Sequence, residues 1–305
     1  MNSLLNWLML PFRLRARGVL GMNARNAGFI LEQNPRALFP LVDDKLRFQE
    51  LCQRIGVPSP TIFAIFVRHG DLRHLEETLV AAPDCVIKPA RGSSGRGVVL
   101  LTGKVAHGWR RHNDSVATLD DVRRHVSDIL SGLYSLGGRP DRALVQQRLR
   151  THPELERISY RGTPDVRVLV YRGEPALAML RLPTRQSGGR ANLHQGGVGV
   201  GVDVLTGTTT LAVCRGRTIE RHPDTGEVMA GQVVPDWHAV LAMAECVARA
   251  TGLGYVGVDI VPEIDGPKVL EANARPGLAI QAANERGLRQ VLEQIDAGHV
   301  CRAVQ

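Results

Sequence analysis

The sequence has little of what several common classes of protein need. Only 4% of its 305 residues are aromatic, and no two cysteines have C-x-x-C spacing. Aromatic side chains are the surfaces on which single-stranded nucleic acid stacks, and paired cysteines are typical of zinc sites. Because the arginines are also scattered, the net charge of +8 does not indicate a nucleic-acid partner. An anionic surface or anionic small substrates explain it equally well.

Cysteine is scarce, and the five residues are odd in number without C-x-x-C spacing. This pattern fits reduced thiols and therefore predicts a cytoplasmic protein. The five cysteines are Cys52, Cys85, Cys214, Cys246 and Cys301.

No apolar run approaches the roughly 20 residues of a membrane-spanning helix. The run Leu4–Phe12 is followed by Arg13, Arg15 and Arg17, whereas a secretory signal carries its positive charge before the apolar stretch. We therefore predict a docked amphipathic helix. Peripheral contact with a membrane or a partner is the alternative, because Trp7 beside a basic flank resembles an interfacial helix.

Familiar phosphate-binding motifs are also missing. A Walker A loop is excluded because Lys88 precedes the glycines, and the protein-kinase motifs do not occur. Instead, Lys88 ends one predicted strand, Gly97 opens the next, and a loop of Gly and Ser connects them. Gly92, Gly95 and Gly97 let backbone approach phosphate oxygens, Ser93 and Ser94 add donors, and Lys88 and Arg96 add charge. This loop predicts a flexible phosphate flap, with a plain hairpin turn as the alternative.

The chain does contain enough apolar residues, 44%, for two or more packed lobes. Residues 43–58 predict a helix with an Asp cap and a Gly stop. Lys45 lies in its first turn, where a cation is unfavourable to the helix dipole, so an anionic ligand or simple solvation must account for it. Further helices are predicted at 71–81 and 118–136, and strands at 61–67, 85–89, 143–149, 165–171 and 175–182.

Two segments carry polar groups suited to an anionic substrate. Alternation places Asp165 and Arg167 on one strand face, where Arg167 suits a phosphate or carboxylate, although an ion pair with Asp165 is an equal alternative. The Gly-rich loop 185–197 brings together Arg190, Asn192 and His194. Such loops often close over substrates, and His194 is either a general base or an ordinary loop histidine.

Three oxygen-bearing side chains lie on two neighbouring predicted strands, 255–261 and 269–273. Asp259 is the one acid in the first, and Glu271 and Asn273 share a face of the second. Two carboxylates and an amide suit Mg2+ or Mn2+ rather than zinc. The alternative is that Asp259 caps a turn and Glu271 is solvated.

Joint metal binding sets a condition on strand register, because directly opposed residues share a face of a sheet. A two-residue turn at Asp265-Gly266 would put Asp259 and Glu271 on opposite faces. Either a three-residue loop of Ile264, Asp265 and Gly266 or a bulge must therefore pair the two acids.

Taken together, the motifs follow one another in the order and spacing of the ATP-grasp superfamily. They are Lys45 at a D-K helix start, I-K-P at 87–89, GSSGRG at 92–97, DVRVLV at 165–170, RANLHQGG at 190–197, GVDIV at 257–261 and VLEANARPG at 269–277. The resemblance extends over about 40–297. Within the superfamily, the sequence resembles the alpha-L-glutamate ligase-like branch, related to ribosomal-protein glutamate ligases and lysine-biosynthesis carrier ligases.

The resemblance implies an α+β, ATP-grasp fold with two lobes and the nucleotide between antiparallel sheets. It divides the chain into a short helical segment 1–40, a lobe 41–142 with the phosphate flap, and a lobe 143–305 with the metal site. It further implies an ATP-dependent carboxylate–amine ligase that joins an amino acid, such as glutamate, to an amine or carboxylate acceptor. A non-catalytic ATP-binding scaffold and a phosphotransferase are the alternatives.

The same resemblance implies roles for single residues. Lys45 and Lys88 contact ATP phosphates with the flap residues Ser93, Ser94, Gly95 and Gly97, and Gln146, Gln147, Arg148 and Leu149 form the adenine hinge. Asp259, Glu271 and Asn273 hold two Mg2+ ions, and Arg167, Arg190, Asn192 and Arg275 face the transferred phosphate and substrate.

One feature departs from the pattern. Such ligases usually carry a full α/β domain ahead of the nucleotide-binding lobes, whereas only about forty residues without a βαβ pattern precede Lys45. We expect a different substrate-binding arrangement, with a partner protein in place of that domain.

Overall fold

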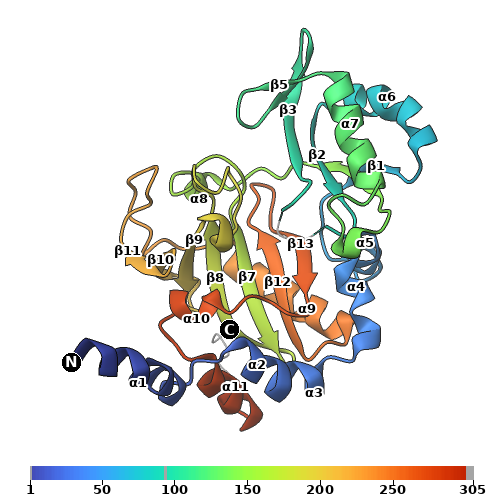
Figure 1. Ribbon diagram of the computed structural model, residues 1–305. Helices are drawn as coiled ribbons and strands as arrows, with labels where there is room; N and C mark the ends of the chain where they lie inside the picture. The colour runs from blue at the N-terminus through green and yellow to red at the C-terminus, as the bar shows by residue number, and fades with distance from the viewer. Residues whose placement is uncertain (1, 93–94, 300–305) are drawn as a thin grey trace.

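The structure is a computed structural model that describes residues 2–92 and 95–299, and it consists of two lobes, each built on an antiparallel sheet (Figure 1). The first sheet has the order β1-β6-β2-β3-β4-β5. Its strands are β1 (Ile62–Phe66), β2 (Asp84–Pro89), β3 (Val99–Val105), β4 (Gly108–Arg111), β5 (Val116–Ala117) and β6 (Ala143–Gln147).

The second sheet has the order β11-β10-β9-β8-β7-β12-β13. Its strands are β7 (Asp165–Tyr171), β8 (Glu174–Leu182), β9 (Val198–Val202), β10 (Thr209–Cys214), β11 (Arg217–Ile219), β12 (Tyr255–Val261) and β13 (Lys268–Asn273). The prediction of an α+β fold with two lobes on antiparallel sheets is confirmed. However, β6, which we placed at the start of the second lobe, lies in the first sheet between β1 and β2.

Short helical elements connect and cover the sheets. They are α1 (Asn2–Ala16), α2 (Met22–Arg25), η1 (Asn26–Ile30), α3 (Leu31–Gln33), η2 (Arg36–Leu38), α4 (Pro40–Asp43), α5 (Lys45–Arg54), η3 (His69–His74), α6 (Leu75–Ala81), α7 (Leu119–Leu130), η4 (Leu136–Gly138), α8 (Pro153–Glu156), η5 (Leu193–Gln195), α9 (Trp237–Thr251), α10 (Ala279–Ala283) and α11 (Leu288–Asp296).

The first lobe buries one face of its sheet against α6 and α7. Cys85 and Ile87 of β2 and Val145 of β6 belong to this core. Because side chains alternate along a strand, Lys88 and Leu144 point to the other face, where Leu144 packs with Leu46 of α5. That face is turned toward the second lobe.

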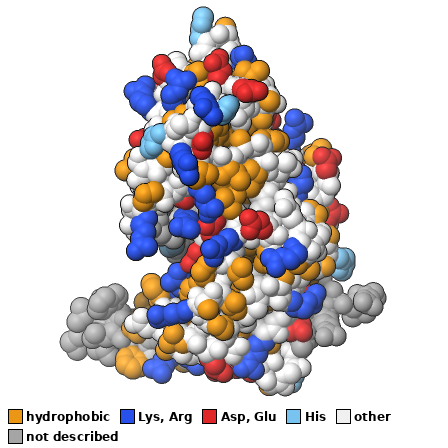
Figure 2. Space-filling model, turned by 90° about the vertical axis from the view of Figure 1, so that its right-hand side faces the viewer, with side chains coloured by type: hydrophobic (Ala, Val, Ile, Leu, Met, Phe, Trp, Pro, Cys, Tyr) orange, Lys and Arg blue, Asp and Glu red, His pale blue; other side chains and the backbone are white. Residues whose placement is uncertain are grey.

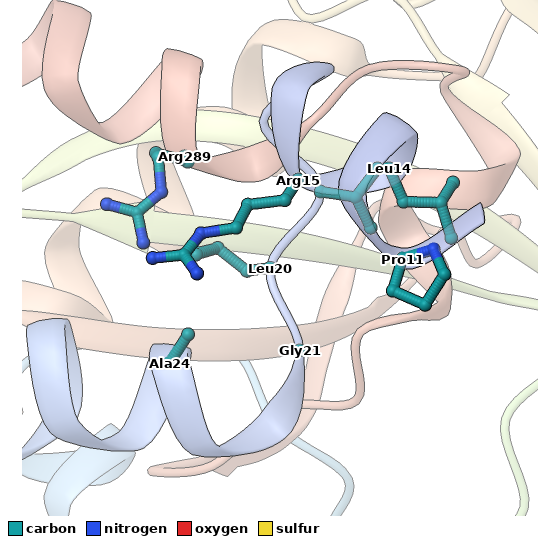
Figure 3. Close-up of a pocket in the computed structure, with 8 residues that line it drawn as sticks. Pro11, Leu14, Arg15, Leu20, Gly21, Ala24 and Arg289 are labelled. Carbon is teal, nitrogen blue, oxygen red and sulfur yellow. The ribbon is translucent and has the colours of Figure 1, made fainter. Parts of the chain in front are cut away.

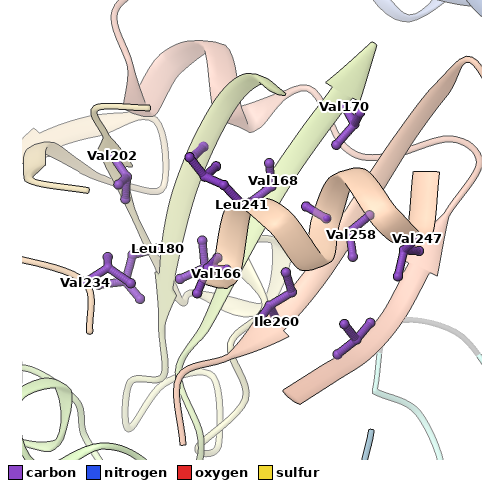
Figure 4. Close-up of a cluster of buried hydrophobic side chains, with 14 of the residues drawn as sticks. Val166, Val168, Val170, Leu180, Val202, Val234, Leu241, Val247, Val258 and Ile260 are labelled. Atoms are coloured by element: carbon purple, nitrogen blue, oxygen red, sulfur yellow. The ribbon is translucent and has the colours of Figure 1, made fainter. Parts of the chain in front are cut away.

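The second lobe buries one face of its sheet under α9. Alternate residues of β7 and β12, such as Val166, Val168 and Val258, meet Leu241 and Val247 of that helix (Figure 4). Burial of a run of such side chains stabilises the lobe by about 1.5–3 kcal/mol for each one. The polar residues Asp165, Arg167 and Asp259 therefore lie on the opposite face.

The N-terminal segment covers part of that opposite face. Phe29 and Ile30 pack with Tyr171 and Tyr255 and with residues of α10 and α11. Asn34 fixes the chain in place, because its Nδ2 donates to the carbonyl oxygens of Tyr255 and Ala274 and its Oδ1 accepts from the Tyr255 N–H. Residues 20–34 of the expected short helical segment are thus part of the second lobe's packing.

Predicted helices are present but some boundaries differ. The Asp cap is Asp44, whose carboxylate accepts from the N–H groups of Leu46 and Arg47. The helix expected over 118–136 ends at Leu130, because Gly132 has φ +86° and a Cβ there would lie 2.4 Å from the Arg139 carbonyl oxygen. Only glycine suits such a position.

Surface charge is spread widely. Figure 2 shows Lys and Arg side chains distributed from top to bottom of one side, with acidic side chains among them. Among the described cysteines, Cys52, Cys85, Cys214 and Cys246 are free. In the ranges 2–92 and 95–299 no helix has the length and apolar character needed to cross a membrane.

Candidate functional site

Strands β12 and β13 bring the two predicted acids together. Asp259 pairs with Glu271, whereas the next pair is Ile260 with Val269, so Leu270 is an extra residue in β13. The register condition is therefore met by a bulge. The three-residue loop was wrong: the turn runs over Glu263–Gly266, closed by a 3.1 Å bond from the Gly266 N–H to the Glu263 oxygen.

Two arginines hold the Asp259 carboxylate, which is fully buried. Arg167 donates through Nε to Oδ1 at 2.7 Å and through Nη2 to Oδ2 at 2.6 Å. Arg181 of β8 donates through Nη2 to Oδ2 at 2.7 Å. Burial alone would raise the pKa of Asp259, but Arg167 and Arg181 outweigh it and hold that pKa below its ordinary value. Asp259 is therefore an anion.

The alternative, an ion pair between Arg167 and Asp165, is wrong, because Arg167 bonds to Asp259. Asp165 instead accepts from Nε of Arg181, so Arg181 bridges the two buried aspartates. Burial raises the pKa of Asp165 to about 7, with Arg181 acting in the opposite direction. The sequence reasoning missed Arg181, although a single arginine in the apolar strand 174–182, opposite Asp165 in register, was a usable signal.

Glu271 and Asn273 complete a compact oxygen-rich cluster with Asp259. Nδ2 of Asn273 lies 3.3 Å from Oδ2 of Asp259 and 3.5 Å from Oε1 of Glu271, and the two carboxyl groups are within hydrogen-bonding reach. Both side chains on β13 are only half-buried. Among the described residues, no group of three His, Cys, Asp or Glu side chains forms a metal site, so any metal here depends on the amide.

The cluster has free coordination capacity for a hard cation. Each carboxylate oxygen has two lone pairs, and Oδ1 of Asp259 accepts only from Arg167 among the bonds described above. The oxygen and nitrogen of an Asn amide are assigned from hydrogen bonding. With the Asn273 amide turned by half a turn, its oxygen would lie beside Glu271. Two carboxylates and an amide oxygen are ligands of the kind that Mg2+ takes.

Lys88 and Lys45 lie across from this cluster, on the first lobe. Lys88 is only 6% exposed, and burial, followed by repulsion from Lys45, lowers its pKa to about 7 although Glu271 acts in the opposite direction. Nζ of Lys45 donates to the Gly92 carbonyl oxygen at 2.7 Å. The structure therefore brings two lysines and an acidic cluster from the two lobes to one place.

This environment would make the binding of a nucleotide's phosphates dependent on pH. At pH 8 Lys88 is mostly neutral, since its pKa is about 7, and bound phosphates would favour its cation. We expect nucleotide binding at pH 8 to take up close to one proton, and affinity to fall as pH rises above about 7, by up to roughly tenfold per pH unit.

Titration calorimetry in two buffers of different ionisation enthalpy measures this uptake. Lys88→Arg keeps a permanent charge, so its uptake should vanish. Equal uptake in both proteins, or none in the wild type, would exclude Lys88 as the titrating contact.

The flap is held by residues that the sequence did not reveal. His125 of α7 bonds through Nε2 to the Gly97 carbonyl oxygen at 2.9 Å, and Tyr134 lies against Gly97, where a Cβ would be 2.6 Å from its ring. Gly97 has φ +72°, so both backbone conformation and space require glycine. Ser93 and Ser94 lie outside the described residues.

The second lobe also contacts the flap. A Cβ on Gly95 would lie 3.1 Å from Cδ of Arg190, so the loop 185–197 reaches the flap from the other side. Asn192 caps η5 by accepting from the His194 N–H at 3.0 Å, and His194 is exposed. Arg275 lies 3.9 Å from Asp43 and stacks on Phe39, so its guanidinium is directed to the N-terminal segment.

In the expected adenine hinge, several side chains are already bonded to other parts of the protein. Nε2 of Gln146 donates to Gln49 and to the Pro60 carbonyl oxygen, and Arg148 forms an ion pair with Asp84. Gln147 accepts from Nζ of Lys268 at 3.4 Å, which connects β6 with β13. Leu149 is 5% exposed. These contacts fix the segment between the two sheets, with the Gln146 side chain buried and that of Arg148 paired with Asp84.

Comparisons with known proteins identify the family of this chain. Residues 24–297 match the family described as sugar-transfer associated ATP-grasp. A probable alpha-L-glutamate ligase from Trichodesmium erythraeum is 28% identical over 250 residues, covering 82% of this chain and 61% of that protein. One from Legionella pneumophila (strain Corby) is 27% identical over 256 residues, covering 83% and 63%. The chain thus spans about three fifths of the length of these curated relatives.

Solved structures give weaker similarities. D-cycloserine synthetase aligns with a TM-score of 0.49 at 17% identity, over 87% of this chain and 73% of that one. A RimK domain ATP-grasp protein from Sphaerobacter thermophilus aligns with a TM-score of 0.47 at 16% identity, over 88% and 71%. The resemblance drawn from the motifs is confirmed by the family match. Since that match runs through both sheets, this chain belongs to the sugar-transfer associated ATP-grasp family.

Proposed function

We propose that the protein is an ATP-dependent carboxylate–amine ligase that adds glutamate or another amino acid to an acceptor through an acyl phosphate. The observation that carries this proposal is the opposition of Lys88 and Lys45 on one lobe to Asp259, Glu271 and Asn273 on the other. A polyphosphate with bound cations is the kind of ligand that needs both sets of charges.

The reaction follows from the charges. A carboxylate and an amine do not condense at neutral pH, so an oxygen of the carboxylate attacks the γ-phosphorus of ATP and ADP leaves. The amine then attacks the acyl carbon, the C–N bond forms, and phosphate leaves while the amine loses a proton. The protein's contribution is mostly positioning and electrostatic stabilisation.

Each group has a part in that scheme. Lys88, Lys45 and the flap backbone would hold the phosphates, and Arg190 would reach them from the second lobe. Asp259, Glu271 and Asn273 would hold Mg2+, which supplies positive charge to the phosphate oxygens. Asp259 also orients Arg167 and Arg181, whose remaining N–H groups can face the acceptor. A closed flap excludes water, which would otherwise hydrolyse the acyl phosphate.

The matched family and the curated relatives carry different names, and both bear on the proposed substrate class. The matched family is described as sugar-transfer associated, whereas the curated relatives are probable alpha-L-glutamate ligases. Both are consistent with an amino acid joined to an amine-bearing acceptor, and we propose that class. The main alternatives are a non-catalytic ATP-binding scaffold and a phosphotransferase that uses the same nucleotide site.

A phosphate-release screen distinguishes the three. With ATP and Mg2+, amino acids and amine acceptors, including amino sugars and short peptides, are supplied singly and in pairs, and products are identified by mass. A ligase releases phosphate at a high rate only when acid and amine are both present. A stable phosphorylated product would assign a phosphotransferase, and binding of ATP without turnover for any pair would favour the scaffold.

A further inference from the structure

Helix α1 leaves four large apolar side chains of its second half in solvent. Met9, Leu10, Phe12 and Leu14 are 50%, 46%, 67% and 40% exposed. Successive residues of a helix are about 100° apart, so Leu10 and Phe12 point to nearly opposite sides. A docked amphipathic helix would bury one apolar face, and Met9, Leu10 and Phe12 do not form one. Figure 1 shows α1 extending away from the rest of the lobe.

The positive charges of α1 have no acidic partner among the described residues. The helix contains no acidic residue, and Arg13, Arg15 and the adjoining Arg17 are exposed. None of the three forms an ion pair within residues 2–92 and 95–299. Such a surface suits an anionic partner that also has apolar character.

A hollow beneath the helix combines the same two features. It has a volume of about 380 Å³ and lies between α1, α2 and α11, lined by Pro11, Leu14, Val19, Leu20, Gly21 and Ala24 together with Arg15 and Arg289 (Figure 3). The floor is apolar and the guanidinium of Arg15 lies at its edge, beside that of Arg289, which pairs with Glu293 at 3.4 Å. Such a site suits a lipid, whose phosphate pairs with arginine while its chain stays out of water.

The length of the apolar stretch fits half a bilayer. Residues 4–12 have one polar member, Asn6, and nine helical residues rise about 13 Å. The hydrocarbon core of a bilayer is about 30 Å thick, so the stretch matches one leaflet and ends where the arginines begin. We propose that α1 binds an anionic lipid bilayer, with its apolar residues in one leaflet and its arginines among the headgroups.

Co-sedimentation of the full chain with vesicles tests this. We expect binding to phosphatidylcholine vesicles containing phosphatidylglycerol that is at least roughly tenfold tighter than to phosphatidylcholine alone, and that weakens with salt. Phe12→Asp should remove most binding. Val233→Asp is the matched control, since Val233 is an exposed apolar residue (57%) on another part of the lobe, and it should bind as the wild type does.

Quenching by brominated lipids provides a second measurement. Trp109 and Trp237 are 3% and 5% exposed, so lipid-dependent quenching would come from Trp7 in the apolar stretch. Absence of vesicle binding, or equal binding by Phe12→Asp, would overturn the proposal. A concentration-dependent dimer that Phe12→Asp abolishes, without vesicle binding, would instead assign this surface to a second copy of the chain.

Discussion

Glu271→Ala is expected to lower the rate of ATP turnover roughly a hundredfold, because about 3 kcal/mol of transition-state stabilisation is lost. The physical reason is that Glu271 is half-buried and, unlike Asp259, is bound by no arginine of the described residues. Its loss removes negative charge that would neutralise a bound cation without leaving a buried partner unpaired. The thermal unfolding midpoint should therefore stay close to that of the wild type.

Steady-state turnover at saturating Mg2+ and thermal unfolding measure the two effects. Glu220→Ala is the control, because Glu220 is exposed and lies outside the cluster. Turnover of Glu271→Ala near the wild-type rate would remove Glu271 from the proposed metal site.

The comparable substitution at Asp259 is expected to behave differently. Asp259→Ala would leave Arg167 and Arg181 with side chains that are each 12% exposed and without this partner. Breaking a buried pair in this way costs about 3–5 kcal/mol of folding stability. Loss of turnover in Asp259→Ala would therefore be mixed with loss of stability, and only Glu271→Ala gives a clean test of catalysis.

Lys88→Ala is expected to weaken nucleotide binding by about 2 kcal/mol, roughly thirtyfold. A charged contact to the phosphates would be lost, while the fold should not suffer, because Lys88 is a buried cation whose charged form is disfavoured in the free protein. Lys45→Ala should have a smaller effect on affinity and should loosen the flap, since Lys45 donates to Gly92.

Calorimetry with ATP analogues and Mg2+ tests this pair of variants. Lys104→Ala, an exposed lysine on β3 of the same lobe, is the control for the general loss of positive charge. An unchanged affinity in Lys88→Ala would contradict the role given to β2 and the flap.

Much of the fold was predictable because its signals are local. Asp44 caps α5, alternation along β7 and β12 separates Val166 and Val258 from Arg167 and Asp259, and the Arg172-Gly173 turn joins β7 to β8. These features depend on neighbouring residues or on strand period. The same local rules placed Asp259, Glu271 and Asn273 on neighbouring strands.

The remaining features depend on contacts between distant parts of the chain. The local sequence indicates that a bulge or a loop with an odd number of residues is needed. It does not indicate that Leu270 is the extra residue. Arg181 donates to Asp259, 78 residues away in the sequence, and His125 bonds to Gly97. These contacts form only when the strands and helices pack together. The end of α7 at Leu130 likewise depends on Gly132 packing against Arg139.

The central claim is that a carboxylate is activated as an acyl phosphate between these lobes. Its most direct test uses the acid and amine identified by the phosphate-release screen, with the carboxylate labelled with ¹⁸O. The account predicts that each turnover transfers one labelled oxygen to the released phosphate, as measured by mass spectrometry. Phosphate without label, at a rate equal to that of product formation, would contradict an acyl-phosphate intermediate.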